Sequence, residues 1–191
     1  MNGIKDEKNS LRDLYRQRRE ALTMSERAVR DAAVCRAIAA ASSYRHAAVI
    51  LGYAPRGTEI DIAPLLQRAL TEGKRVALPR SRRGGEMAFH YISSLDSLVT
   101  GLYGISEPPE DAPLYEGAPA SLCLVPAFSF DRDGYRIGYG GGYYDRFLRE
   151  YAGTAIGVVY HDFLNEHLPR GRYDLPVAAL VTDRGILPIE R

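Results

Sequence analysis

A glycine-rich stretch is the part of this sequence whose residue types and spacing point most directly to chemistry. Residues 136–145 read Arg-Ile-Gly-Tyr-Gly-Gly-Gly-Tyr-Tyr-Asp. Glycine has no Cβ, so its backbone N–H can approach a ligand closely and its φ can be positive. A run of such N–H groups before a helix makes a concave anion site. The stretch lacks the lysine and Ser/Thr of a P-loop and the G-x-G-x-x-G spacing, so it is neither of the two common nucleotide-binding motifs. We interpret it as an anion-binding loop, with a tight structural turn as the alternative.

The residues after the glycines predict a helix that begins near Gly142. Aromatic and apolar residues recur at helical spacing from Tyr144 onward, so Tyr144 is expected to face the core and Tyr143 to meet a ligand. Asp145 falls in the first turn, where the helix dipole favours a carboxylate, and it could pair with Arg149 one turn later. Alternatively, Asp145 holds Mg²⁺ beside a bound phosphate, because Mg²⁺ prefers carboxylate, water and phosphate oxygens.

The rest of the chain alternates predicted strands and helices, as is typical of a parallel sheet covered by helices. Helices are expected at 8–22, at about 26–41 after a capping box at Thr23, and after Asp61. Strands are expected at 47–53, 75–79, 87–92, 122–130, 154–160 and 177–182, with an edge at 186–189. A short helix is expected at 96–102 and loops at 103–109 and 161–174.

Two features beside these elements carry candidate site residues. The 54–59 loop follows a strand, and ligands of parallel sheets bind at the carboxyl ends of strands, so Glu59 is either a ligand contact or a charge at a helix entry. The 8–22 helix is expected to bury its leucines and Tyr15 and to carry a basic stripe. That stripe, which is Lys8, Arg12, Arg16 and Arg19, is either solvated or supplies one or two cations to an anionic ligand. In the next helix, Val29 and several alanines are expected to be buried.

The composition limits the class of protein. With 191 residues and 46% hydrophobic residues, the chain predicts a flexible leader at 1–7 and a single domain at 8–191. The net charge of +1 argues against a generic nucleic-acid binder. No apolar run is long enough to span a bilayer, the amino terminus has no signal-peptide pattern, and the two cysteines are far apart, so a cytoplasmic protein is expected. Scattered acidic residues and histidines in 161–174 match no standard metal signature and are interpreted as a solvated loop.

Residues 136–145, followed by Arg146 and Leu148, closely resemble the signature of the 5-formyltetrahydrofolate cyclo-ligase family. The segments 8–12, 75–79, 103–108 and 124–128, with Glu59, resemble further landmarks of that family. The resemblance implies a three-layer α/β/α fold with a mostly parallel central sheet. It also implies cyclisation of 5-formyltetrahydrofolate to 5,10-methenyltetrahydrofolate, dependent on ATP and Mg²⁺, with ADP and phosphate released and the protein acting as a monomer.

The resemblance further implies roles for individual residues. The catalytic residues would be Arg136, Tyr143 and Asp145. ATP would be contacted by Lys8, Arg12, Arg136, Gly138, Tyr139, Gly140, Gly141, Gly142 and Tyr143. The folate would lie near Ala54, Glu59 and Tyr143. Mg²⁺ would be held by Asp145 and Asp174, although the family usually shows a histidine before that last aspartate where this chain has Tyr173.

Two other functions remain open on the sequence. The basic stripe would suit a non-catalytic nucleotide-binding or RNA-binding protein of the same fold, whose RNA binding would be sensitive to salt. An ATP-dependent enzyme acting on a related pterin would use the same loop.

Overall fold

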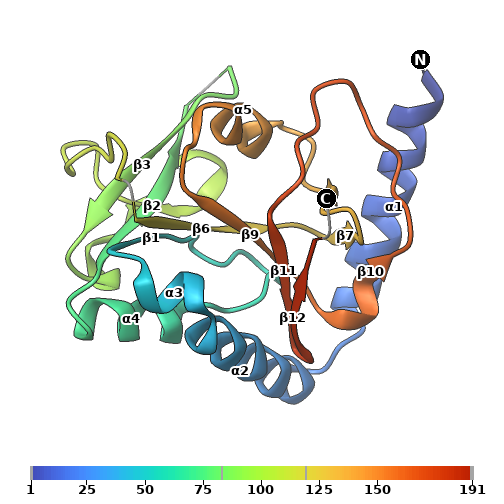
Figure 1. Cartoon of the computed structure of the whole chain (residues 1–191). Helices are drawn as coiled ribbons and strands as arrows, with labels where there is room; N and C mark the ends of the chain where they lie inside the picture. Colours follow the sequence, from blue (N-terminus) through green and yellow to red (C-terminus); the bar gives the residue numbers. More distant parts are fainter. Residues whose placement is uncertain (1, 83, 119, 190–191) are drawn as a thin grey trace.

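The computed structural model describes residues 2–82, 84–118 and 120–189, and its centre is a seven-stranded sheet (Figure 1). The strand order is β12-β11-β9-β6-β1-β2-β3. The four inner pairs are parallel, and the two edge pairs, β11–β12 and β2–β3, are antiparallel. The strands are β1 (Val49–Leu51), β2 (Arg75–Ser81), β3 (Met87–Ile92), β6 (Ser121–Pro126), β9 (Thr154–Val158), β11 (Ala179–Thr182) and β12 (Gly185–Pro188). The predicted strands and the predicted edge are confirmed, with shorter bounds in most cases.

Helices cover both faces of the sheet, which confirms the predicted three-layer α/β fold. The helices α2 (Met24–Ala40), α3 (Ser42–His46) and α4 (Ala63–Thr71) lie on one face, and α5 (Tyr143–Glu150) lies on the other (Figure 1). Strands β1 and β6 are buried almost throughout, as expected for strands covered on both sides. Among the described residues, none of the helices has the length and hydropathy needed to cross a bilayer.

A second sheet carries the glycine loop. It has the order β10-β7-β8, with β7 (Ser129–Asp131), β8 (Arg136–Ile137) and β10 (Leu164–Asn165). The fully buried carboxylate of Asp131 accepts hydrogen bonds from the N–H groups of Asp133 and Tyr135, and these close the turn between β7 and β8. Its other oxygen accepts from Leu168 N–H and from Arg170, so the same carboxylate fastens the 168–170 segment to this turn.

The amino-terminal helix differs from its prediction in two ways. The helix α1 spans Asn2–Glu20, so residues 2–7 of the predicted flexible leader are helical, and Met1 lies outside the described residues. No proline lies between residues 2 and 8, and extending a helix adds a hydrogen bond for each residue fixed. The buried face agrees with the prediction at Tyr15, Leu11 and Leu22 but not at Leu14, which is 47% exposed, and Arg19 is buried as well. Three residues of the basic stripe, Lys8, Arg12 and Arg19, therefore face the body of the protein, whereas Arg16 is exposed.

Two further predictions are wrong. Val29 is 69% exposed, and α2 instead buries Val34 and Ile38 against the sheet, because packing rather than alanine content sets the buried face. The predicted 96–102 helix is a 3₁₀ turn at Leu95–Ser97 followed by β4 (Val99–Thr100). That strand pairs with β5 (Ser106–Glu107), which lies in the expected loop after the 3₁₀ turn at Leu102–Gly104. A third 3₁₀ turn spans His161–Phe163.

Close packing between the two sheets gives a stability prediction. A Cβ on Gly157 of β9 would lie 2.6 Å from the ring of Phe130 and 2.8 Å from Leu180, and both side chains are buried. We expect Gly157→Ala to lower the free energy of unfolding by about 1–3 kcal/mol, because the added methyl overpacks the core. Urea denaturation measures this change.

The matched control is Gly3→Ala. A Cβ there meets nothing within 4 Å, and the residue is helical. We expect no loss of stability, or a gain of up to about 1 kcal/mol, because alanine favours a helix over glycine. Equal stability of Gly157→Ala and the wild-type protein would contradict the packing argument.

Candidate active site

The glycine loop begins a helix, as predicted. Gly142 is the N-cap of α5 and has φ +67°, in the left-handed region that favours glycine. Gly140 has φ +93°, and a Cβ on it would lie 3.3 Å from the Arg12 guanidinium carbon. Both the conformation and the close approach of α1 therefore require glycine at position 140.

Two arginines hold the carbonyl groups of this loop. Arg12 Nε donates to Gly138 O at 2.7 Å, and Arg146 Nη2 donates to Gly141 O. The N–H groups of Gly140, Gly141 and Gly142 donate no hydrogen bond to any part of the chain that the structure describes. The loop thus has occupied carbonyls and available N–H groups, which is the polarity that an anion requires.

Arg136 and Asp145 form a buried ion pair across the loop. Arg136 Nη2 donates to Asp145 Oδ1 at 2.6 Å, and the two side chains are 6% and 24% exposed. Arg136 Nη1 also donates to Leu175 O, and Asp145 Oδ1 accepts from Leu175 N–H. The alternative pairing of Asp145 with Arg149 does not occur, because the Arg149 guanidinium lies over the ring of Tyr173. Three segments therefore meet at Asp145.

Lys8 and Asp174 form a second ion pair beside the first. Lys8 Nζ donates to Asp174 Oδ2, which also accepts from Gly171 N–H. Because Asp174 precedes Leu175, this pair adjoins the Arg136–Asp145 pair. The structure thereby brings Lys8, Arg12, Arg136, the glycine loop and both predicted metal ligands together.

The carboxylates of Asp145 and Asp174 offer part of the coordination shell that one Mg²⁺ requires. Among the described residues, Asp145 Oδ2 and Asp174 Oδ1 accept no hydrogen bond, so one oxygen of each group remains for a cation. The described residues contain no cluster of three or more His, Cys, Asp or Glu side chains that could hold a metal ion. Mg²⁺ is commonly held by one or two carboxylates with water and phosphate completing its shell, so these residues fit it only together with a phosphate ligand.

Glu59 lies near Tyr139 of the loop, and its Oε2 accepts a hydrogen bond from Arg56 N–H at 2.7 Å. Burial raises the pKa of Glu59, whereas its interactions with Tyr139 and Arg56 and the positive charge of Arg19 oppose that rise. Glu59 also lines a groove of about 770 Å³ between α2 and α4, in which Ala54 is not among the lining residues.

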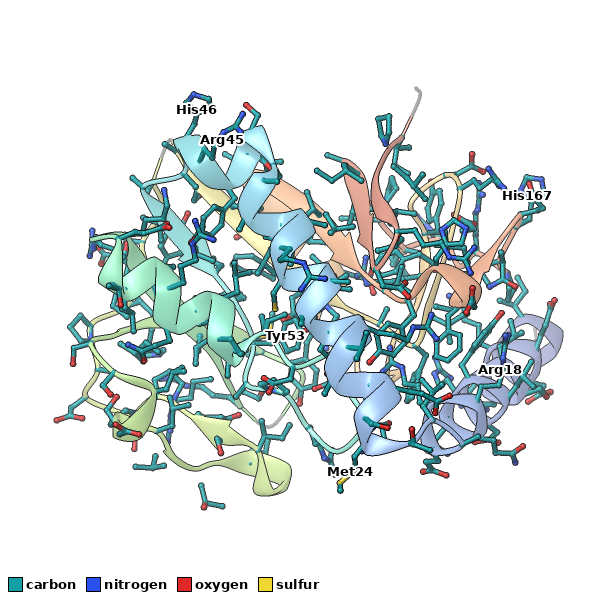
Figure 2. All side chains as sticks on the ribbon, turned by 90° about the horizontal axis from the view of Figure 1, so that it is seen from below. Arg18, Met24, Arg45, His46, Tyr53 and His167 are labelled. Carbon is teal, nitrogen blue, oxygen red and sulfur yellow. The ribbon has the colours of Figure 1, made fainter. Side chains whose placement is uncertain are left out.

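The loop that carries Glu59 and Ala54 is anchored from the core. Tyr53 is buried, and its hydroxyl donates to Ile60 O at 3.0 Å. Figure 2 places Tyr53 between α2 and α4. Ala54 follows directly and is half-buried. The carboxyl end of β1 thus delivers both predicted folate residues, although the structure records no direct contact between them.

The two tyrosines after the glycines have different surroundings. The Tyr143 hydroxyl donates to Arg82 O at 3.4 Å, across to the turn between β2 and β3, and Arg146 Nε donates to Gly85 O in the same turn. Tyr144 packs against the core, as predicted. Its hydroxyl is nonetheless buried without a hydrogen-bond partner among the described residues, near Glu59 and Arg136. Tyr144 is therefore a core residue whose unpaired hydroxyl lies close to the candidate site.

Arg19, a member of the predicted basic stripe, is buried rather than solvated. It is only 2% exposed and donates to Ala127 O. Its guanidinium lies 5.1 Å from the centroid of the Phe128 ring, and that ring stacks against Tyr139 at 4.5 Å. The helical spacing of Lys8, Tyr15 and Arg19 could have indicated one common face, but a stripe of charges is normally solvated.

The remaining polar cluster is structural. Asp162 pairs with Arg30 and Arg184, and Glu166 pairs with Arg132. The interpretation of 161–174 as an exposed polar segment therefore holds for these two residues, whereas Asp174 at its end joins the site.

Comparisons with known proteins agree on one family. A sequence model of the 5-formyltetrahydrofolate cyclo-ligase family matches residues 4–183, a range that includes every residue of the candidate site. The 5-formyltetrahydrofolate cyclo-ligase of Mycolicibacterium smegmatis is 34% identical over 148 residues, which are 73% of this chain and 76% of that protein. The Escherichia coli enzyme of the same name is 33% identical over 132 residues, covering 65% and 71%. The solved structure of Aquifex aeolicus 5,10-methenyltetrahydrofolate synthetase superimposes with a TM-score of 0.84 at 31% identity, covering 96% of this chain and 93% of that one.

The Arg136–Asp145 pair gives a prediction that needs no substrate. Asp145→Asn leaves the buried Arg136 guanidinium without its counter-charge, so we expect a loss of about 2 kcal/mol in the free energy of unfolding. Arg136→Met combined with Asp145→Asn should cost less than the sum of the two single changes. A double-mutant cycle by urea denaturation measures the coupling.

The control pair is Arg132 and Glu166, whose side chains are 71% and 75% exposed. The same cycle on Arg132→Met and Glu166→Gln should show no measurable coupling, because an exposed ion pair contributes little. Additive effects at Arg136 and Asp145 would contradict the proposed dependence of the site on this pair.

Proposed function

Because this chain belongs to the 5-formyltetrahydrofolate cyclo-ligase family, an ATP-dependent ligase family, we propose that it cyclises 5-formyltetrahydrofolate to 5,10-methenyltetrahydrofolate and releases ADP and phosphate. One observation carries the proposal beyond family membership. The glycine loop with its available N–H groups lies among Lys8, Arg12, Arg136 and two carboxylates, which come from distant segments of the chain. This combination suits a triphosphate.

The reaction needs the formyl oxygen to become a leaving group. Transfer of the γ-phosphoryl group from ATP to that oxygen forms a P–O bond and releases ADP. The N10 nitrogen of the same folate then attacks the formyl carbon, N10 loses its proton, and the C–O bond breaks as phosphate leaves with the oxygen. No protein nucleophile takes part. The protein's contribution is to position the two substrates and to neutralise charge.

The residues divide between the two substrates. Backbone N–H groups of 140–142 would bind phosphate oxygens, and Lys8 and Arg12 would add positive charge beside them. Arg136 would neutralise charge on the phosphoryl group while holding Asp145. Glu59, at the other side of Tyr139, would bind the folate, with Ala54 lining its approach and Tyr143 lying where the two substrates meet.

We propose Mg²⁺ as the metal, held by Asp145 and Asp174 together with phosphate oxygens. When bound, it would neutralise phosphate charge and orient the transferred group. The carboxylate oxygens that remain available on both residues support this assignment.

The first functional test is an assay with ATP, Mg²⁺ and 5-formyltetrahydrofolate, followed by the absorbance of the methenyl product. We expect product only when ATP is present. Asp145→Asn should lower kcat about 100-fold, because a group that acts on developing charge is removed. Circular dichroism establishes that the variant is folded.

The control for that change is Glu150→Gln, an exposed carboxylate at the end of the same helix, which should keep wild-type turnover. Absence of ATP-dependent product from the wild-type protein would refute the proposed reaction. Wild-type turnover in Asp145→Asn would leave Asp145 as a structural partner of Arg136 only. A panel of other formylated pterins separates this reaction from one on a related substrate.

A second test concerns the amino-terminal helix. Lys8→Met should raise KM for ATP about tenfold, since one charge-assisted contact to phosphate is lost, and should leave KM for the folate nearly unchanged. Lys5→Met, which removes an exposed cation from the same helix, should change neither constant. Equal effects of Lys8→Met on both constants would argue for a general structural role.

A further inference from the structure

We propose that Arg146 is a positioning residue, which fastens the turn between β2 and β3 to the glycine loop and thereby keeps an N–H group of the loop pointing toward a bound phosphate. That a nucleotide supplies the phosphate rests on the proposed function. The turn comprises residues 82–86, of which the structure describes 82 and 84–86. Neither the spacing of the glycines nor the family resemblance gives this turn a role.

Arg146 contacts two carbonyl groups that are far apart in the sequence. Its Nε donates to Gly85 O at 2.8 Å, and its Nη2 donates to Gly141 O. A guanidinium is planar and its N–H donors have a fixed geometry, so holding both carbonyls fixes their relative positions. The Tyr143 hydroxyl adds a second link to the same turn, since it donates to Arg82 O at 3.4 Å.

Glycines leave the space that this guanidinium occupies. A Cβ on Gly85 would lie 1.9 Å from Arg146 Nη2, and a Cβ on Gly142 would lie 3.1 Å from its Nη1. Gly84, the neighbour of Gly85, has φ +90°, and Gly85 has φ +86°, so the two share a left-handed backbone. A Cβ on Gly84, however, meets nothing within 4 Å. Of these two turn glycines, only Gly85 is needed for the approach of Arg146.

The turn is itself fixed to the core, so it can act as an anchor. Glu107 is 2% exposed, and its Oε1 accepts a hydrogen bond from Ser81 N–H at 3.0 Å, at the end of β2. Arg80 Nη1 donates to Pro108 O at 2.8 Å beside it. Arg146 therefore ties the glycine loop to a fixed part of the fold, although its own side chain is exposed.

The contact with Gly141 O determines where the next N–H group points. A peptide group is planar and trans, so the carbonyl of Gly141 and the N–H of Gly142 point in opposite directions. That N–H donates no hydrogen bond to the described part of the chain. Residues 140–142 are all glycine, and such a segment loses much conformational freedom when it is ordered. Arg146 holds the carbonyl side of this peptide, so the N–H side faces away from Arg146, where an anion can bind.

The experiment first examines the loop without any substrate. ¹⁵N relaxation and relaxation dispersion report the motion of the 140–142 N–H groups on the ps–ns and μs–ms timescales. In the wild-type protein we expect order parameters of about 0.85 and no dispersion. In Arg146→Met we expect order parameters below about 0.6 or dispersion at these groups, because the carbonyl is released.

The second measurement is the affinity for ADP in the presence of Mg²⁺. We expect Arg146→Met to raise its Kd about tenfold, because the apparent Kd rises in inverse proportion to the fraction of molecules whose loop is competent to bind. The Kd for 5-formyltetrahydrofolate should change little, since the released peptide belongs to the phosphate side of the proposed site. A general loss of structure would raise both constants.

Three further variants separate this contact from other effects. Arg146→Lys keeps the charge but has one donor nitrogen in place of the planar fork, so it should resemble Arg146→Met. Gly85→Ala places a methyl where the guanidinium lies and should have the same effect. Gly84→Ala is the matched control, because it brings similar backbone strain without that clash, and it should leave the loop rigid and the Kd unchanged.

A loop that stays rigid on both timescales in Arg146→Met would overturn the inference. So would a wild-type Kd for ADP in Arg146→Lys beside a raised one in Arg146→Met, because charge alone would then explain the effect. The relaxation measurement needs no substrate, so the two proposals can fail separately. A wild-type protein that binds no ADP, with a loop that loosens in Arg146→Met, would refute the proposed function and leave the coupling of the turn to the loop standing.

Discussion

The ion pair between Arg136 and Asp145 is the contact on which the arrangement of the site depends. It joins the strand before the glycine loop to the first turn of the helix after it, so the loop cannot open without breaking a buried charge pair. Both partners also bind the backbone of Leu175. That contact places Asp174 next to the loop, where Lys8 pairs with it from a position 166 residues earlier in the chain. The first and last parts of the sequence thus meet at one point.

The two ion pairs also determine which hydrogen-bond donors remain available to a ligand. In the described structure Lys8 and Arg136 already have carboxylate partners, so the backbone N–H groups of the loop are the donors that remain available. A polyanion entering the loop would gain those donors but would come close to Asp145 and Asp174. Like charges at short distance are unfavourable. A divalent cation on the available carboxylate oxygens would offset that repulsion, which is why the proposed metal and nucleotide are expected to bind together.

Sequence reasoning succeeded where the determining chemistry is local. The start of α5 at Gly142, the capping box at Thr23 and the bounds of β3 depend on neighbouring residues, and all three are confirmed. The resemblance supplied the site residues, but no spacing indicates that Arg12 holds Gly138 O across 126 positions. Long-range packing also decided the buried face of α2 and the exposure of Leu14 in α1, both of which hydrophobic periodicity assigned wrongly. Periodicity identifies residues that share a face and leaves open which face the rest of the chain covers.

In α1 the rest of the chain covers a face of the helix that carries three positive charges. Lys8, Arg12 and Arg19 recur at helical spacing and point into the protein. A helix rises about 1.5 Å per residue, so Lys8 and Arg19 are separated by about 16 Å along its axis. The first two cations reach Asp174 and the glycine loop, and the third lies over the Phe128 ring, which packs against Tyr139 of the same loop. One face of one helix therefore positions charges along the whole length of the proposed site.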